Sequence, residues 1–158
     1  QRREVGHWEA DTIISRASSP VLQLAVERVT LLSRLNRLPS RSPSPMRKTL
    51  NRSLSQLPQS KRRTITFDNG AENAHHQAIN AVLGTQSYFC TPYTSQERGT
   101  VENTAGLVRR FFPKKTNFAI LSQRDIKRVE YWLNSLPRKC LGYLTPAEAF
   151  RSGVALRP

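Results

Sequence analysis

The chain has 158 residues, a length that predicts one domain. Its 25 lysines and arginines outnumber its 11 aspartates and glutamates, and the net charge of +14 argues against a neutral metabolic enzyme and for a polyanionic partner. No apolar run approaches the roughly 18 residues of a membrane span, and the two cysteines form neither a metal-binding spacing nor a disulfide framework, so we expect no membrane and a cytoplasmic, reducing setting.

The first third of the chain predicts three β-strands, over residues 7–15, 21–28 and 31–38. In the first of them, alternation places Glu9, Asp11 and Ile13 on one face of the strand. Short links join the three strands, and strands joined in this way form an antiparallel meander.

Helices and strands alternate in the rest of the chain. The Ser/Pro-rich segment 39–45 predicts a loop that enters a helix; a linker between domains is the alternative, but neither flank is large enough to stand alone. The elements expected after this loop are a helix over 46–57, a strand over 63–68, a helix over 72–83 with Ala78, Ile79, Val82 and Leu83 inward, a strand over 86–90, a helix over 100–112 and a helix from Ser122 to Pro137. This order predicts an α/β fold in which helices pack on a mixed sheet.

The chain contains only three aspartates, and two of them occupy unusual positions. Asp125 lies three residues after Ser122 and is explained by a capping box at the start of the last helix. Asp11 and Asp68 lie in or at the end of predicted strands, where aspartate is depleted. For Asp68 a turn formed by Asp-Asn-Gly remains an alternative to a functional acid.

Glu102 is a third candidate acid, in the first turn of the helix over 100–112. Glutamate is ordinary there because of the helix dipole, but Glu102, Gly106 and Arg109 form a stripe separate from the apolar stripe of that helix. Three converging carboxylates in a basic protein suggest Mg²⁺ or Mn²⁺, and two such ions would suit phosphoryl transfer on a nucleic acid.

Four ordered motifs carry a resemblance to a known family. They are "GHWEADTI", "TITFDNGAE", "YFCTPYTSQERGTVENTAGLVRRFFPKKT" and "LNSLPRKCLGYLTPAEAF". Together they resemble the catalytic core of the insertion-sequence-thirty family of bacterial transposases, within the wider integrase group, over about residues 6–150. The 33 residues between Asp68 and Glu102 are similar to the spacing of the second and third acids in that family.

The resemblance implies a ribonuclease-H-like α/β fold, with a mixed five-stranded sheet made of the antiparallel meander plus two parallel strands and flanked by helices. It implies that residues 1–158 are one catalytic core, without the helix-turn-helix part that the family carries at its N-terminus. It also implies that Asp11, Asp68 and Glu102 are the catalytic acids and hold Mg²⁺ or Mn²⁺, expected as two ions.

The implied reaction is metal-dependent cleavage and strand transfer of DNA by a 3′-hydroxyl. The implied partners are the transposon ends and target DNA, with the protein a homo-oligomer on DNA. By resemblance, Arg98 and Asn103 surround the catalytic Glu and are candidate DNA contacts. A basic patch of Arg109, Arg110, Lys114 and Lys115 beside Glu102 also suits the DNA backbone, although a solvated helix end is the alternative reading.

Two other functions stay open. The chain departs from the family pattern at several positions, among them Asn73, where the family has an aromatic residue, so a catalytically decayed DNA-binding remnant is one alternative. A ribonuclease-H-type nuclease that acts on RNA–DNA hybrids is the other, because it would share the acids and the fold.

Overall fold

The computed structural model describes residues 4–92, 94 and 98–153 of the chain. In this part, five strands form one mixed sheet in the order β3–β2–β1–β4–β5. The strands are β1 (His7–Ile13), β2 (Val21–Glu27), β3 (Ser33–Leu38), β4 (Thr64–Phe67) and β5 (Gln86–Phe89). The first three are antiparallel neighbours, and β4 and β5 run parallel to β1. The predicted meander with two added parallel strands is therefore confirmed.

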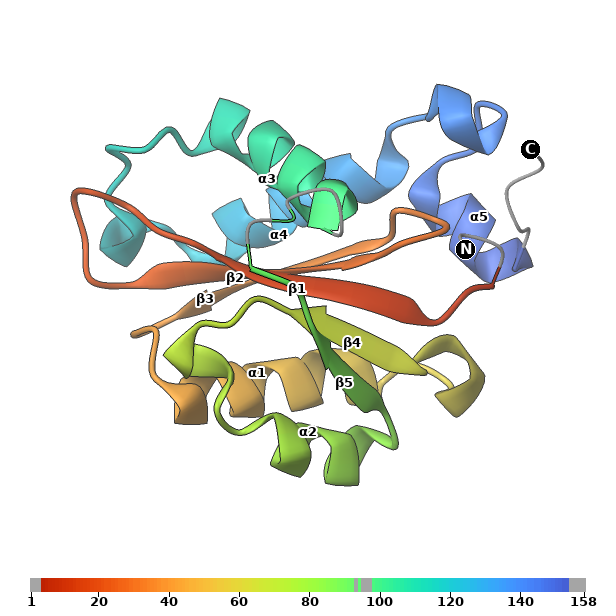
Figure 1. Ribbon diagram of the computed structural model, residues 1–158. Coiled ribbons are helices and arrows are strands. Elements are labelled where there is room, and N and C mark those ends of the chain that lie inside the picture. Colours follow the sequence, from red (N-terminus) through yellow and green to blue (C-terminus); the bar gives the residue numbers. More distant parts are fainter. Residues whose placement is uncertain (1–3, 93, 95–97, 154–158) are drawn as a thin grey trace.

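Helices cover the sheet from both sides (Figure 1). The α-helices of the described residues are α1 (Pro43–Ser55), α2 (His76–Leu83), α3 (Gly99–Phe111), α4 (Gln123–Ser135) and α5 (Pro146–Ser152). Helices α1 and α2 lie on one face of the sheet, and α3 and α4 lie on the other (Figure 1). None of these helices is both long and apolar enough to cross a membrane.

Strand β1 lies at the centre of the sheet, and its alternation distributes side chains between two cores. Trp8 and Ala10 belong to the apolar cluster with α1 and α2, whereas Ile13 belongs to the cluster with α3 and α4. Glu9 lies between Trp8 and Ala10 in the sequence and points to the opposite face. It is also fully buried, because helices cover both faces of the sheet. Asp11 alternates in step with Glu9 and Ile13, as the sequence predicts, and so lies on the face toward α3.

Two expectations for the helices needed correction. Residues 71–73 form a 3-10 turn, and α2 begins only at His76; Ile79 and Leu83 are buried in it, but Ala78 is exposed and Val82 is 58% exposed. Helix α2 packs on α1 and β5 along a narrow stripe, so the wider apolar face predicted for it was wrong. The short helix α5, which Thr145 opens with a capping box, was not predicted.

The face of the sheet toward α3 is covered unequally. Helix α4 packs on β3, and α3 packs on β2 and β1. Strands β4 and β5 present Thr64, Thr66 and Tyr88 on the same face, where the two threonines are half-buried and Tyr88 is 53% exposed. The sheet therefore has a covered half, β2 and β3, and an open half, β4 and β5, with β1 between them.

Candidate active site where β1 and β4 lie side by side

The parallel register of β1 and β4 brings the two predicted aspartates together. Trp8 pairs with Ile65 and Glu9 with Thr66. Continued by two residues, this register places Asp68, just after the end of β4, opposite Asp11. Neighbouring strands lie about 4.8 Å apart, so two carboxylates on the same face at this point must share their surroundings.

Arg98 connects the two carboxylates. Its Nη2 lies 3.0 Å from Asp11 Oδ1, and its Nη1 lies 3.7 Å from Asp68 Oδ2. Nη2 also donates a hydrogen bond to the carbonyl oxygen of Ala10, at 3.0 Å. Asp11 and Asp68 are thus oriented toward a single cationic group.

The ion pairs of Arg98 are stronger than surface pairs because the residue is only 8% exposed. Burial favours the neutral form of the guanidinium, but the two aspartates outweigh burial and hold the pKa of Arg98 above its ordinary value. The resemblance suggested that Arg98 contacts DNA; in the structure its guanidinium contacts Asp11 and Asp68, and the contact with DNA stays a prediction.

Asp68 is held by the turn that follows it. Its Oδ1 accepts hydrogen bonds from the backbone N–H of Gly70, at 3.0 Å, and from Nδ2 of Asn73, at 2.7 Å. Asn73, a buried residue, also donates to the carbonyl oxygen of Asp68. The turn reading of Asp-Asn-Gly and the functional reading are therefore compatible. The departure at Asn73 has a local role here, because an aromatic residue could not make these bonds.

Glu9 fastens α3 to the central strand. Its carboxylate is fully buried, accepts a hydrogen bond from the backbone N–H of Val101 at 2.8 Å, and forms an ion pair with Nε of Arg28 at 3.0 Å. Val101 lies in the first turn of α3, where backbone N–H groups have no partner within the helix. These contacts give Glu9 a structural role, and they fix the helix one residue before Glu102.

Glu102 is placed on α3 as predicted, in its first turn, and is exposed to solvent. Among the residues that the structure describes, no three histidine, cysteine, aspartate or glutamate side chains gather closely enough to hold a metal ion. The structure thus brings Asp11 and Asp68 together and does not bring Glu102 to them. Its assignment as a third metal ligand stays a prediction.

A second ion pair, in which the carboxylate is buried and the arginine is exposed, lies beside the aspartates and was missed from the sequence. Glu72 is 6% exposed, and its Oε1 accepts from Nη2 of Arg41 at 2.9 Å and from Oγ1 of Thr12 at 3.0 Å. Burial raises the pKa of Glu72, but these hydrogen bonds outweigh it and leave the pKa below its usual value. Hydrogen bonding to Glu72 raises the pKa of Arg41, and Asp68 and Asp11 add to this effect.

The signal for this pair was weak. Glu72 stands inside the motif "TITFDNGAE", but Arg41 lies in the segment 39–45, whose composition predicts only a loop.

The other predicted DNA contacts lie on α3 and just after it. Asn103, Arg110, Lys114 and Lys115 are exposed. Arg109 is half-buried: its Nη2 donates to the carbonyl oxygen of Ile14 at 2.6 Å, and burial lowers its pKa. Within the described residues, the side chains of the other four form no hydrogen bond or ion pair, so the contacts with DNA stay predictions.

The donor chemistry of the two aspartates suits a hard divalent cation. Carboxylate oxygens are the ligands that Mg²⁺ and Mn²⁺ prefer, and the oxygens of Asp11 and Asp68 already face one positive charge. The guanidinium of Arg98 occupies the position between them. An ion bound by both carboxylates would replace this guanidinium as their partner.

The chain is similar in sequence to several transposases. It is 37% identical over 155 residues to the transposase InsI for insertion sequence element IS30A of Escherichia coli K12, and the match covers 98% of the chain and 40% of that protein. It is 38% identical over 150 residues to the transposase for IS4351 of Bacteroides fragilis, and 33% identical over 150 residues to that for IS1086 of Cupriavidus metallidurans. These two matches cover 95% of the chain and 46% and 44% of the relatives. The chain thus spans less than half of the length of these relatives, and no protein-family model matches it.

The fold is similar to that of a solved structure. A chain of the simian T-cell lymphotropic virus intasome, in complex with PP2A regulatory subunit B56 gamma, matches with a TM-score of 0.77 and 17% sequence identity, over 100% of this chain and 58% of that one. This likeness confirms the ribonuclease-H-like fold of the integrases. Over the segment that it spans, the chain is similar to transposases of insertion sequence elements, IS30A among them, at 33–38% identity.

Proposed function

We propose that the chain is the catalytic core of a DNA transposase that cleaves and rejoins strands with the help of divalent metal ions. The observation that carries the proposal is the convergence of Asp11 and Asp68 on one cation, at neighbouring strands of an integrase-like sheet, in a homologue of transposases. Neither a basic surface nor the fold alone requires two aspartates at that point.

The proposed reaction is an in-line displacement at phosphorus. Water first attacks the phosphodiester at the element end and frees a 3′-hydroxyl; this hydroxyl then attacks a second phosphodiester, so that one P–O bond forms as another breaks. Asp11 and Asp68 would hold Mg²⁺ or Mn²⁺, with Glu102 approaching from α3. When bound, two such ions stabilise both the attacking and the leaving oxygen.

Arg98 is proposed to exchange partners during this process. In the structure its guanidinium faces both carboxylates, and its single positive charge offsets one of their two negative charges. If metal ions bound Asp11 and Asp68, the side chain of Arg98 would be free to contact a phosphate nearby. A guanidinium matches phosphate with two parallel hydrogen bonds.

DNA is the proposed partner, both as element ends and as target, with several copies of the protein assembled on it. The net charge of +14 and the exposed side chains of Arg110, Lys114 and Lys115 after Glu102 supply cations for the phosphate backbone. The similarity of the chain to transposases, and of its fold to that of a chain in an intasome, supports this proposal.

A branched oligonucleotide that reproduces a strand-transfer product tests the chemistry, because the reverse displacement needs no recognition of element ends. We expect the chain to resolve this branch with Mg²⁺ or Mn²⁺ and not with EDTA. Asp68→Asn should abolish the reaction, while the matched control Glu4→Gln, at an exposed carboxylate that precedes β1, should keep it. Equal activity in Asp68→Asn and the parent chain would contradict the proposal.

One observation favours a second candidate, a DNA-binding remnant without turnover. Glu102 is exposed and, among the described residues, forms no metal-binding cluster with the two aspartates, which have Arg98 as their cationic partner. A remnant would bind DNA with a strong dependence on salt and none on divalent ions. DNA binding without resolution of the branch, at any concentration of Mn²⁺, would select this candidate.

A further inference from the structure

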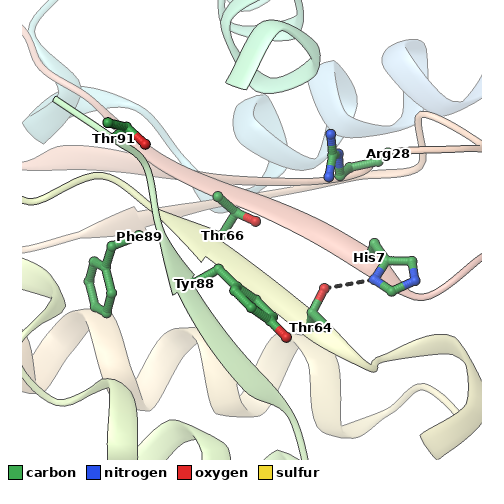
Figure 2. A pocket seen from close by; sticks show the side chains of 7 residues that line it. All are labelled: His7, Arg28, Thr64, Thr66, Tyr88, Phe89 and Thr91. Carbon is green, nitrogen blue, oxygen red and sulfur yellow. Dashed lines mark hydrogen bonds between the residues drawn. The ribbon is translucent and has the colours of Figure 1, made fainter. Parts of the chain in front are cut away.

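An open groove of about 440 Å³ lies on the open half of the sheet (Figure 2). Thr64 and Thr66 of β4 and Tyr88 of β5 line it, together with Thr91, His7 and Arg28. The groove is too small for a duplex and is of the size of pockets that take one small molecule or a few nucleotide units.

The groove adjoins the proposed active site. Thr66 lies two residues before Asp68 on the same face of β4, a separation of about 6.6 Å along a strand. Thr91 follows Cys90, whose backbone N–H donates to the carbonyl oxygen of Phe67, next to Asp68. The Arg28 side of the groove is held by Glu9, the same carboxylate that fixes the first turn of α3.

The side chains that line the groove suit a nucleotide. Thr64 and Thr66 supply hydroxyls, His7 Nδ1 lies 2.8 Å from Thr64 Oγ1, and Arg28 supplies a guanidinium. No aspartate or glutamate lines the groove in the part of the chain that the structure describes. Hydroxyls and a guanidinium are groups that contact phosphate and sugar oxygens, and the lack of a lining carboxylate removes the main source of repulsion.

Tyr88 provides a surface on which a base can stack. Its side chain is 53% exposed, and its hydroxyl donates to Oε1 of Gln86 at 3.2 Å, which restrains the ring. The register places Tyr88 opposite Thr66, and Figure 2 shows the ring beside Thr64 and Thr66 on the neighbouring strand. A base can reach an aromatic ring in such a groove only when it has left the duplex.

We infer that this groove binds an unpaired stretch of DNA next to the reacting phosphate, with a base against Tyr88 and the backbone toward Arg28. The inference rests on the proposed function and adds to it a preference for DNA that is single-stranded beside the cleavage point. The groove then guides the strand along the open half of the sheet to Asp11 and Asp68.

Fluorescence anisotropy with two labelled DNAs tests the inference. One is a blunt duplex, and the other is the same duplex with a four-nucleotide single-stranded tail; both are titrated with the full 158-residue chain in EDTA. We expect the tail to tighten binding about fivefold or more, the size of one stacked base. Tyr88→Ala should remove this gain, Tyr88→Phe should keep most of it, and Thr66→Val should reduce it.

Tyr131 of α4 supplies the matched control, since it is 74% exposed and lies away from the groove. Tyr131→Ala should keep the gain from the tail. The inference is overturned if the tail gives no gain to the parent chain, or if Tyr88→Ala and Tyr131→Ala lose equal amounts. Failure of the proposed function would instead appear as a branch left unresolved, an outcome that leaves these binding ratios unchanged.

Discussion

On the side of the sheet where α3 packs, the covered half and the open half differ in composition and in how far helices cover them. In the covered half, every residue of β2 is buried, and Leu22, Leu24 and Leu35 pack against α3 and α4. In the open half, Thr64, Thr66 and Tyr88 occupy equivalent positions and remain in contact with solvent. The covered half supplies stability, and the open half leaves a surface free beside the two aspartates. Strand β1 joins the halves and carries Asp11.

The largest effect on stability is expected from breaking the connection between β1 and α3. Glu9→Ala removes a buried carboxylate and leaves Arg28 and the N–H of Val101 without their partner, so unfolding free energy should fall by about 3–5 kcal/mol. Urea denaturation measures this loss. Glu4→Ala, at a carboxylate with 65% exposure, should change stability by no more than about 0.5 kcal/mol. Similar losses of stability in both variants would show that the buried contact between β1 and α3 does not stabilise the fold.

A pair of truncations compares the halves directly. Leu35→Ala in β3 creates a cavity under α4 and should cost about 2–5 kcal/mol of unfolding free energy. Thr66→Ala in β4 removes a half-buried hydroxyl and should cost about 1 kcal/mol or less. Urea denaturation measures both losses, and the two midpoints can be compared if unfolding free energy falls with urea at the same slope in both variants. A loss for Thr66→Ala as large as that for Leu35→Ala would contradict the division of the sheet into covered and open halves.

The ion pair between buried Glu72 and exposed Arg41 predicts a dependence of stability on pH. The pKa of Glu72 is lower in the folded chain than in the unfolded chain, so its stabilisation is fully present above its ordinary pKa near 4.5 and is lost as pH falls through the folded value. Glu72→Gln should therefore destabilise the chain at pH 7, by about 1–3 kcal/mol. The difference from the parent chain should shrink below pH 4.5, and thermal unfolding at several pH values measures it. A difference that is constant with pH would exclude this role.

The smallest expected effect concerns the basic surface after α3. Lys115→Gln should weaken DNA binding only slightly and lower the slope of log affinity against log salt by about 1, if the side chain contacts one phosphate. Binding titrations between low and moderate salt measure the slope. Lys48→Gln, an exposed lysine on α1 across the sheet, is the control and should leave the slope unchanged. An unchanged slope for Lys115→Gln would favour a solvated helix end.

Patterns of short range in the sequence predicted most of the fold. Alternation in β1 placed Asp11 on the correct face, and the spacing of Ser122 and Asp125 predicted the capping box at the start of α4. The exposure of Val82 was not predicted, because the apolar pattern of a helix contains no information on how far a neighbouring element extends. Helix α5 was missed although its start carries a local signal, a capping box of Thr145 and Glu148 with Pro146 at the first helical position.

The site was predicted only in part, because the sequence shows local features and not contacts between distant residues. Asp11 and Asp68 stood out because aspartate is rare in strands and rare in this chain. The ion pairs of Arg98, and the pair of Arg41 with Glu72, join residues far apart in the sequence. No spacing rule relates such residues, since the folded sheet alone determines which arginine of so many lies beside which acid.

Calorimetric titration of Mn²⁺ into the chain tests most directly whether Asp11 and Asp68 form a metal site beside the open half of the sheet. We expect two ions to bind to the parent chain, binding to be lost in Asp68→Asn and in Glu102→Gln, and binding to be unchanged in Glu4→Gln. Binding that is the same in Asp68→Asn as in the parent chain, or no binding to a folded parent chain, would contradict it.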